Sequence, residues 1–204
     1  MATASHRLAG VTMIVIAIAA TGCARTTASS LVASDASGIH FGRIMVSVPF
    51  TDLGLRREAE DQFAKSYSGK GVMFVPSYQV LFPGRSYSQD EAQQVIRGDS
   101  IDGVLFITLN QAGTTAYRTP TTTSTQCAAN DTYAQCASTT TGGYDIRKPW
   151  ASFTAQLYDA RTGRSIWIAT ENTRGNAFAN SGTVVRSMAN STLKQLEKDG
   201  VIPE

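Results

Sequence analysis

Few residues of this 204-residue chain have the type and spacing that catalysis requires. We expect His6 to be removed with the apolar segment that follows it, and the one imidazole then left, on His40, cannot build a histidine-rich zinc site. We therefore expect His40 to lie on the surface. Asp99, Asp102 and Asp159 are the candidate general acids of a small hydrolase, which is the weakest of our hypotheses. We expect Asp102 and Asp159 to organise turns instead, and we predict no enzyme activity, no cofactor and no metal.

Three cysteines are the most reactive side chains of the sequence. Cys127 and Cys136 are separated by eight residues in a polar segment, without a Cys-x-x-Cys spacing or a nearby histidine. This pattern predicts a structural disulfide in an oxidising compartment, with a metal or catalytic pair as the alternative. A loop of that size contributes about 2.5 to 3 kcal/mol in the chain-entropy model, which shapes a loop but does not hold a domain together. The pairing leaves Cys23 as an odd thiol that needs another role.

Cys23 follows an N-terminal segment typical of secretion signals. His6 and Arg7 precede an apolar stretch over residues 8–20, which is too short to span a bilayer as a helix. Ala20-Thr21-Gly22-Cys23 resembles the lipobox of bacterial lipoproteins, with alanine in place of the commoner leucine at its first position. The resemblance implies a signal peptide over residues 1–22 and acylation of Cys23. An ordinary secretory signal with an incidental cysteine is the alternative.

The residues after Cys23 refine the expected location. Ala24 and Arg25 lack the aspartate that resembles an inner-membrane retention signal, so the resemblance implies the outer membrane, with the domain on its periplasmic face. Several acyl chains would hold the protein firmly at that membrane. Residues 24–38 are rich in Ser, Thr and Ala, and we expect residues 23–42 to form the lipidated cysteine and a flexible tether.

Composition is that of a folded domain without an electrostatic surface for nucleic acid. Hydrophobic residues make up 42% and charged residues 17% of the chain. The 18 basic and 16 acidic residues nearly cancel, and no run concentrates one sign of charge. Nucleic acid is therefore not an expected partner.

Hydrophobic periodicity and capping residues predict the elements of one domain over residues 43–202. Asp52 is a candidate helix N-cap, and Ser88 with Glu91 has the spacing of a capping box. The most apolar segment, residues 102–109, is typical of a central strand covered on both faces. Predicted strands cover 43–48, 72–75 with extended chain over 77–81, 102–109, 150–158 and 165–170, and predicted helices cover 53–67, 89–97 and 182–199.

This order predicts an α+β fold with a mixed sheet of about five strands and helices packed against it. The chain resembles small bacterial lipoproteins whose fold is similar to the N-terminal domain of TolB and to the periplasmic domain of the curli-secretion lipoprotein. The resemblance covers about residues 43–202 and implies a fold rather than a function. It rests on the strand at 43–48, Arg56-Arg57-Glu58-Ala59-Glu60, Val75-Pro76-Ser77, Asp102-Gly103-Val104-Leu105, Leu157-Tyr158-Asp159 with Thr162-Gly163 and Trp167, and the segment from Leu196 to Ile202.

Residues 111–148 form a long insert rich in Ser and Thr. Its tyrosines, Tyr117, Tyr133 and Tyr144, have the composition of a recognition surface, and a solvated excursion is the other interpretation. The insert lacks the alternation of apolar residues that membrane-spanning strands need, so we expect it not to line a pore.

Two further pairs of residues have structural interpretations. Arg56 and Arg57 are expected to be solvated or paired with Glu60 or Asp61 rather than to bind a ligand. Trp150 and Trp167 are expected to cover the sheet, although one of them could be an exposed anchor.

We therefore expect a lipid-anchored, non-enzymatic module of the bacterial cell envelope. It would bind an envelope protein, or a cell-wall component, through the hairpin edge and the insert. The alternative is an oligomeric assembly or secretion subunit resembling the curli-secretion lipoprotein, for which the native mass would be many times that of one chain. The sequence does not predict the oligomeric state or the partner's identity.

Overall fold

The computed structural model describes residues 23–36, 38–129 and 134–203. The predicted signal peptide lies outside these residues. No helix within them is long and apolar enough to cross a membrane. The strands are β1 (Ala24–Val32), β2 (Arg43–Ser47), β3 (Met73–Pro76), β4 (Gly103–Arg118), β5 (Thr122–Ala129), β6 (Ala134–Thr141), β7 (Asp145–Asp159) and β8 (Ser165–Gly175), and the helices are α1 (Leu53–Ser66), α2 (Ser77–Val80), α3 (Gln89–Gly98) and α4 (Ser181–Lys198).

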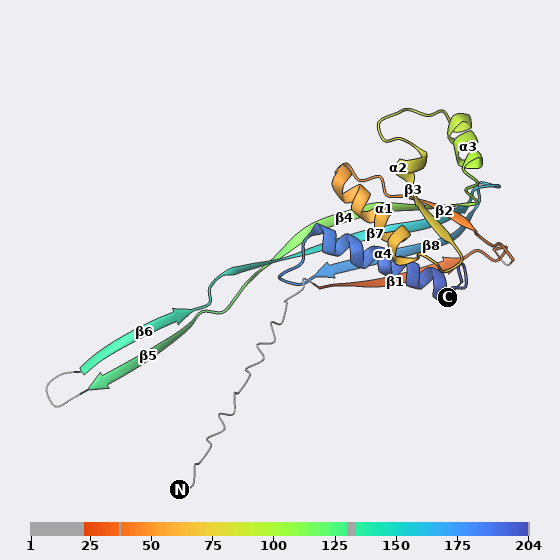
Figure 1. Cartoon of the computed structure of the whole chain (residues 1–204). Helices are drawn as coiled ribbons and strands as arrows, with labels where there is room; N and C mark the ends of the chain where they lie inside the picture. Colours follow the sequence, from red (N-terminus) through yellow and green to blue (C-terminus); the bar gives the residue numbers. More distant parts are fainter. Residues whose placement is uncertain (1–22, 37, 130–133, 204) are drawn as a thin grey trace, which may run out of the picture.

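A six-stranded mixed sheet in the order β1-β8-β7-β4-β2-β3 forms the body of the protein (Figure 1). β2 is parallel to its neighbours β3 and β4, and the remaining pairs are antiparallel. A second sheet contains β5 and β6. The α+β prediction is therefore confirmed, with six strands in the main sheet instead of about five because β1 joins its edge.

The helices divide between the two faces of the sheet. α1 and α4 cover one face, and the core beneath them contains Phe63, Leu105, Leu157 and Met188, all with no exposed surface. α2 and α3 cover the other face near β2 and β3, over a smaller cluster that includes Met45. Asp52 caps α1 and the Ser88–Glu91 capping box begins α3, as predicted.

The expectation that residues 102–109 are covered on both faces is wrong. Leu105 and Ile107 are buried beneath the helices, but Phe106 is 38% exposed on the opposite face. Leu109, which pairs with the buried Phe153 toward the end of the helix-covered face, is 42% exposed. α2 and α3 lie over the β2–β3 side of that face and leave Phe106 open. The continuous apolar run therefore overstated burial, because its alternate residues have different surroundings.

The predicted flexible tether is also wrong over residues 24–32, which form the edge strand β1. β1 pairs with β8 along its whole length, from Ala24 opposite Gly175 to Val32 opposite Trp167. Its inward side chains are all small, and Thr26 forms hydrogen bonds with Thr173 (2.8 Å) and Ser187 (2.9 Å). Because backbone pairing and hydroxyl contacts hold this strand in place, its sequence needs no alternating apolar residues. A sequence analysis that depends on such alternation therefore does not detect the strand.

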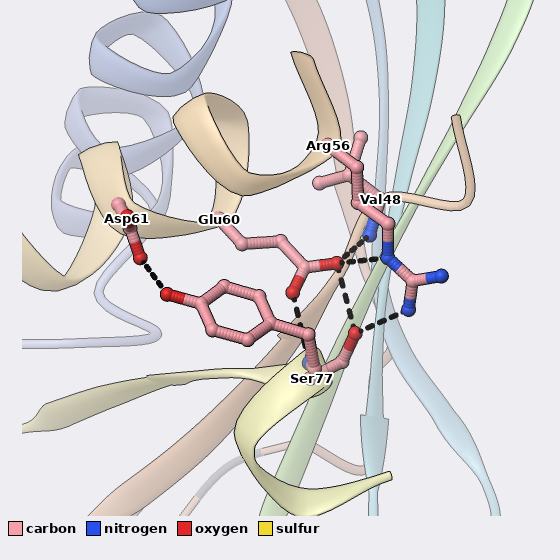
Figure 2. A network of polar contacts seen from close by, with 6 residues as sticks. Val48, Arg56, Glu60, Asp61 and Ser77 are labelled. Atoms are coloured by element: carbon pink, nitrogen blue, oxygen red, sulfur yellow. Dashed lines mark hydrogen bonds and ion pairs between the residues drawn. The ribbon is translucent and has the colours of Figure 1, made fainter. Parts of the chain in front are cut away.

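Residues 77–81 were expected to be extended, but Ser77–Val80 form the short helix α2. The buried carboxylate of Glu60 accepts hydrogen bonds from the Tyr78 N–H (3.2 Å) and the Ser77 hydroxyl (2.8 Å), as Figure 2 shows. It thereby satisfies a backbone donor in the first turn of α2, which has no side-chain cap. The long-range partner decides this conformation, and the local sequence does not reveal it.

The insert is a folded hairpin rather than a loop without secondary structure. β4 and β7 continue beyond the body as a two-stranded ladder to the pair Arg118–Asp145, and β5 and β6 extend it to Ala129–Ala134 (Figure 1). We call residues 114–148 the arm and the remaining described residues the body. At about 3.3 Å per residue, the arm reaches up to roughly 50 Å from the body.

Candidate interaction surface

Most of the described side chains of the arm are exposed, and the exceptions, Thr119 and Ile146, are half-buried. All side chains from Thr122 to Cys127 are exposed, as are those from Cys136 to Thr141. Cross-strand hydroxyl pairs line it, including Thr123 with Thr140 (3.1 Å) and Thr125 with Ser138 (2.8 Å). The described side chains of the arm therefore form no hydrophobic core, and backbone pairing, hydroxyl pairs and the disulfide hold these strands together.

The predicted disulfide between Cys127 and Cys136 is present in the structure. The two cysteines are direct partners in the β5–β6 register. The bond therefore fixes the alignment of the strands near the end of the arm. A covalent link at this position compensates for the absence of packing that would otherwise specify the register.

The predicted tyrosines lie along the arm rather than in one cluster. Tyr117 is 52% exposed near the base, and the ammonium group of Lys148 lies 5.6 Å from the centre of its ring. Tyr144 is 63% exposed, and its backbone pairs with that of Thr119 next along the ladder. Tyr133 lies outside the described residues. Two aromatic side chains therefore face solvent in the half of the arm nearer the body.

Cys23 lies at the end of the body from which the arm extends. The exposed Cys23 immediately precedes β1, and its carbonyl accepts a hydrogen bond from the Asn176 N–H (2.9 Å). Ala24 of β1 lies opposite Gly175 of β8, and the adjacent Arg174 of β8 lies opposite Trp150 of β7. Trp150 in turn lies opposite Gly113 of β4. Beyond this end of the sheet only β4 and β7 continue. The predicted lipidation site and the base of the arm therefore share one end of the sheet.

A groove of about 620 Å³ lies at the base of the arm. The first turns of α1 and α4 border it, and its lining is largely apolar, with Leu109, Trp150, Phe153 and Val185 among the residues. The arm and this groove form one continuous candidate surface, because Thr114, the first residue of the arm, and its cross-strand partner Pro149 both line the groove. Trp150 is half-buried over Gly113, where an added Cβ would lie 2.9 Å from the indole ring. The close approach requires glycine at this position.

Asp102 and Asp159 organise turns, as predicted. Asp102 accepts hydrogen bonds from the Gly42 (2.8 Å) and Arg43 (3.0 Å) N–H groups before β2. Asp159 accepts from Arg161 and Thr162 in the β7–β8 turn. Burial acts to raise the pKa of Asp159, but these hydrogen bonds hold it below its ordinary value.

The other candidate residues are separated over the body. His40 is exposed, Asp99 caps the end of α3, and Trp167 is buried with its indole N–H donating to Asp199 (2.7 Å). No group of three or more His, Cys, Asp or Glu that could hold a metal ion occurs among the described residues.

Sequence analysis missed the polar network around Glu60 (Figure 2). Its Oε1 accepts from Val48 N–H (3.0 Å), Arg56 Nε (3.0 Å) and Ser77 Oγ, and its Oε2 accepts from Tyr78. Arg56 therefore pairs with Glu60, as expected. The available signal was the four-residue spacing of Arg56 and Glu60 on a helix, with Glu60 beside Ala59 on the apolar face. Both oxygens are occupied by these bonds, so the network braces α1 against β2 and α2.

Comparisons with known proteins identify no family. No family model matches the chain, and no curated protein matches it. Similar solved structures include the PelC dodecamer from Paraburkholderia phytofirmans, at 18% identity and a TM-score of 0.47, covering 84% of this chain and 97% of that one. Lipoprotein GNA1162 from Neisseria meningitidis is 18% identical with a TM-score of 0.42, covering 77% of this chain and 99% of that one. Likenesses at this level carry no argument about function.

Proposed function

We propose that this chain is a lipid-anchored protein of the bacterial outer membrane, on the periplasmic face, that binds an envelope protein through its arm. The observation that carries the proposal is the arm itself. It is a covalently locked hairpin that leaves the body, buries none of its described side chains and presents aromatic residues to solvent. Such a segment contributes little to the stability of the body, and its ordered shape is suited to recognition.

The edges of the arm offer a specific mode of binding. The strands β5 and β6 contain no charged residue and no proline, and the β5–β6 register has no irregularity. Charges, prolines, bulges or short strands are the devices that protect free edges elsewhere. The body's edge strand β3 has such protection, because it is four residues long and ends at Pro76. The free edges of β5 and β6 are therefore suited to accept an extended strand of a partner.

The lipid anchor rests on Cys23 and its place in the fold. Acylation at Cys23 would hold the body by its arm-bearing end, so the arm and the membrane would be close together. The test is fractionation of cells that express the wild type or Cys23→Ser. We expect the wild type in the outer-membrane fraction and the variant, with an unprocessed or shifted mass, released from it. Identical processing and fractionation of both proteins would contradict the anchor.

The binding role is tested by crosslinking in intact cells, followed by identification of the attached proteins. A variant in which Asn-Gly replaces residues 115–148 keeps the β4–β7 pairing at Thr114 and Pro149. We expect the wild type to be crosslinked to an envelope protein and the variant to lose that product. The same neighbours in both proteins would contradict the role of the arm. The native mass of the detergent-extracted protein distinguishes this function from an oligomeric assembly subunit.

A further inference from the structure

A second groove, next to Cys23, carries positive charge without matching negative charge. It has a volume of about 630 Å³ and lies between β1 and α4. Arg25 of β1 and Arg186, Lys194 and Lys198 of α4 are among the residues that line it, and no described acidic residue does. The three α4 side chains are exposed and recur at helical spacing. The groove therefore presents a row of cations along one side of α4.

The carboxylates close to this row are engaged elsewhere. Glu197 pairs with Lys70 (2.8 Å), and Asp199 accepts from Ser30 (2.6 Å) and from the indole of Trp167. Within the described part of the chain, the ammonium group of neither Lys194 nor Lys198 has an ion-pair or hydrogen-bond partner. Arg186 is the exception, because it lies 3.3 Å from Glu58 of α1. Among the cations of α4, the uncompensated charge is therefore concentrated at the two lysines.

An exposed aromatic residue lies in the segment between β8 and α4, whose Asn176 contacts Cys23. The Asn176 N–H donates to the Cys23 carbonyl, and the Asn176 side chain accepts from the Phe178 N–H (3.0 Å). Phe178 is 70% exposed. Aromatic side chains are favoured at the level of lipid headgroups, and basic side chains are attracted to anionic lipids. Cys23, Phe178 and the lysines thus bring three membrane-binding features together.

We propose that the groove and Phe178 form a membrane-docking surface that binds the anionic phospholipid headgroups of the bilayer in which Cys23 is anchored. The proposal rests on the lipid anchor of the proposed function. Charge complementarity and the continuity of the groove with Cys23 identify the headgroups as the occupant. The surface deepens the proposed function, because it orients the body on the membrane.

The orientation has a consequence for the arm. The cationic row extends from Arg186 to Lys198, roughly 18 Å along α4, and Cys23 lies at the end of the groove nearer the arm. A body held along this row lies with its β1–α4 edge on the membrane. Figure 1 shows that β1, α4 and the arm-bearing strands run in similar directions. The arm then extends along the membrane surface, where it reaches partners held in the same membrane.

Accessibility of the groove to a water-soluble reagent tests the docking. The full chain with Ser191→Cys, a residue that lines the groove, is extracted in detergent and added to preformed vesicles. The vesicles contain phosphatidylcholine alone or with phosphatidylglycerol. We expect a membrane-impermeant maleimide to label Cys at this position at least about tenfold more slowly on the anionic vesicles. We expect high salt to restore the rate, because it screens the charges.

Charge reversal separates this surface from general attraction. In the protein that carries Ser191→Cys, adding Lys194→Glu with Lys198→Glu should make labelling at position 191 equally fast on both kinds of vesicle. The matched control adds Arg85→Glu with Arg97→Glu, which lie outside the groove, and should be labelled like the protein without these charge reversals. Equal labelling of the wild-type groove on both vesicles, with the protein floating on each, would overturn the docking surface and leave the anchor intact. Failure to float with either vesicle would overturn the anchor and the docking surface together.

Discussion

The body and the arm are built partly from the same two strands and are stabilised in different ways. In the body half of β7, Phe153, Ala155 and Leu157 are buried beneath α1 and α4. In the arm half of the same strand, Asp145 and the residues up to Lys148 lie outside the core, and backbone pairing with β4 holds them. One continuous ladder therefore joins a region specified by packing to a region specified by register. This contrast between the two halves of β7 indicates that the stability of the protein comes from the body, whereas we propose that the arm binds the partner.

The largest expected effect on stability lies in the body, at Glu60. Glu60→Ala leaves the Val48 and Tyr78 N–H groups without their acceptor and Arg56 without its counterion. Breaking a buried ion pair by removing one partner costs about 3 to 5 kcal/mol, so we expect a loss of that size in the free energy of unfolding. Urea denaturation measures it. The matched control is Arg57→Ala in the exposed Arg57–Asp61 pair, for which we expect a change within about 0.5 kcal/mol. Equal losses would contradict the buried brace.

A second effect in the body depends on pH and arises from Glu171. Glu171 has no exposed surface, and burial raises the pKa of this carboxyl to about 7, although the hydrogen bond from Thr192 (2.6 Å) acts to lower it. The folded protein therefore binds this proton more tightly than the unfolded chain does. The contribution of the Glu171 carboxyl to the free energy of unfolding is most favourable below its unfolded pKa of 4.5. This contribution declines as pH rises to about 7 and stays low at higher pH. The span is about 3 kcal/mol.

Glu171→Gln isolates this contribution, because it removes the titration and keeps the shape. Measured by denaturation between pH 4.5 and pH 8, the wild type should lose stability relative to the variant as pH rises. Parallel stability profiles of the two proteins over that range would contradict the account. We expect hydrogen exchange in β5 and β6 to show no difference between the two proteins, because Glu171 lies in the body.

A smaller and local effect is expected at the end of the arm. Replacing Cys127 and Cys136 by serine removes a link worth about 2.5 to 3 kcal/mol to the alignment of β5 and β6. We expect amide exchange in residues 122–129 and 134–141 to become faster, with no change in the thermal transition of the body. Loss of cooperative unfolding in the body would show that arm and body form one stability unit, contrary to the comparison.

The smallest effect on stability is expected from removing the arm. Replacing residues 115–148 by Asn-Gly should change the free energy of unfolding of the body by less than about 1 kcal/mol, since no described arm side chain from Thr122 to Thr141 is buried. Denaturation monitored at the buried Trp167 measures this. Unfolding of the shortened protein under native conditions would contradict the separation of the two regions.

The sequence predicted the parts of the molecule that carry a periodic or capping signal. The helices at 53–67, 89–97 and 182–199 and the Cys127–Cys136 pairing agree with the structure within a few residues. The strands that it missed, β1, β5 and β6, consist mostly of small or hydroxyl-bearing residues and have no alternation of apolar residues. Their conformation depends on a neighbouring strand, and a residue pattern on one strand does not contain that information.

The candidate site was predicted in part for the same reason. Residue types alone predicted the exposed tyrosines and the disulfide-closed insert. The position of Cys23 at the same end of the sheet as the arm follows instead from the register of β1, β8, β7 and β4, which the sequence does not reveal. The partners of Glu60 come from three separate segments, so the Arg56 spacing alone could suggest only one of its bonds.

Site-specific photocrosslinking in intact cells tests the binding role of the arm most directly. One protein carries the photoreactive residue in place of Thr125 on the arm, and another carries it in place of Thr170, which is exposed on the body. We expect a discrete crosslinked protein from position 125 and none from position 170. No product from position 125, or the same products from both positions, would contradict it.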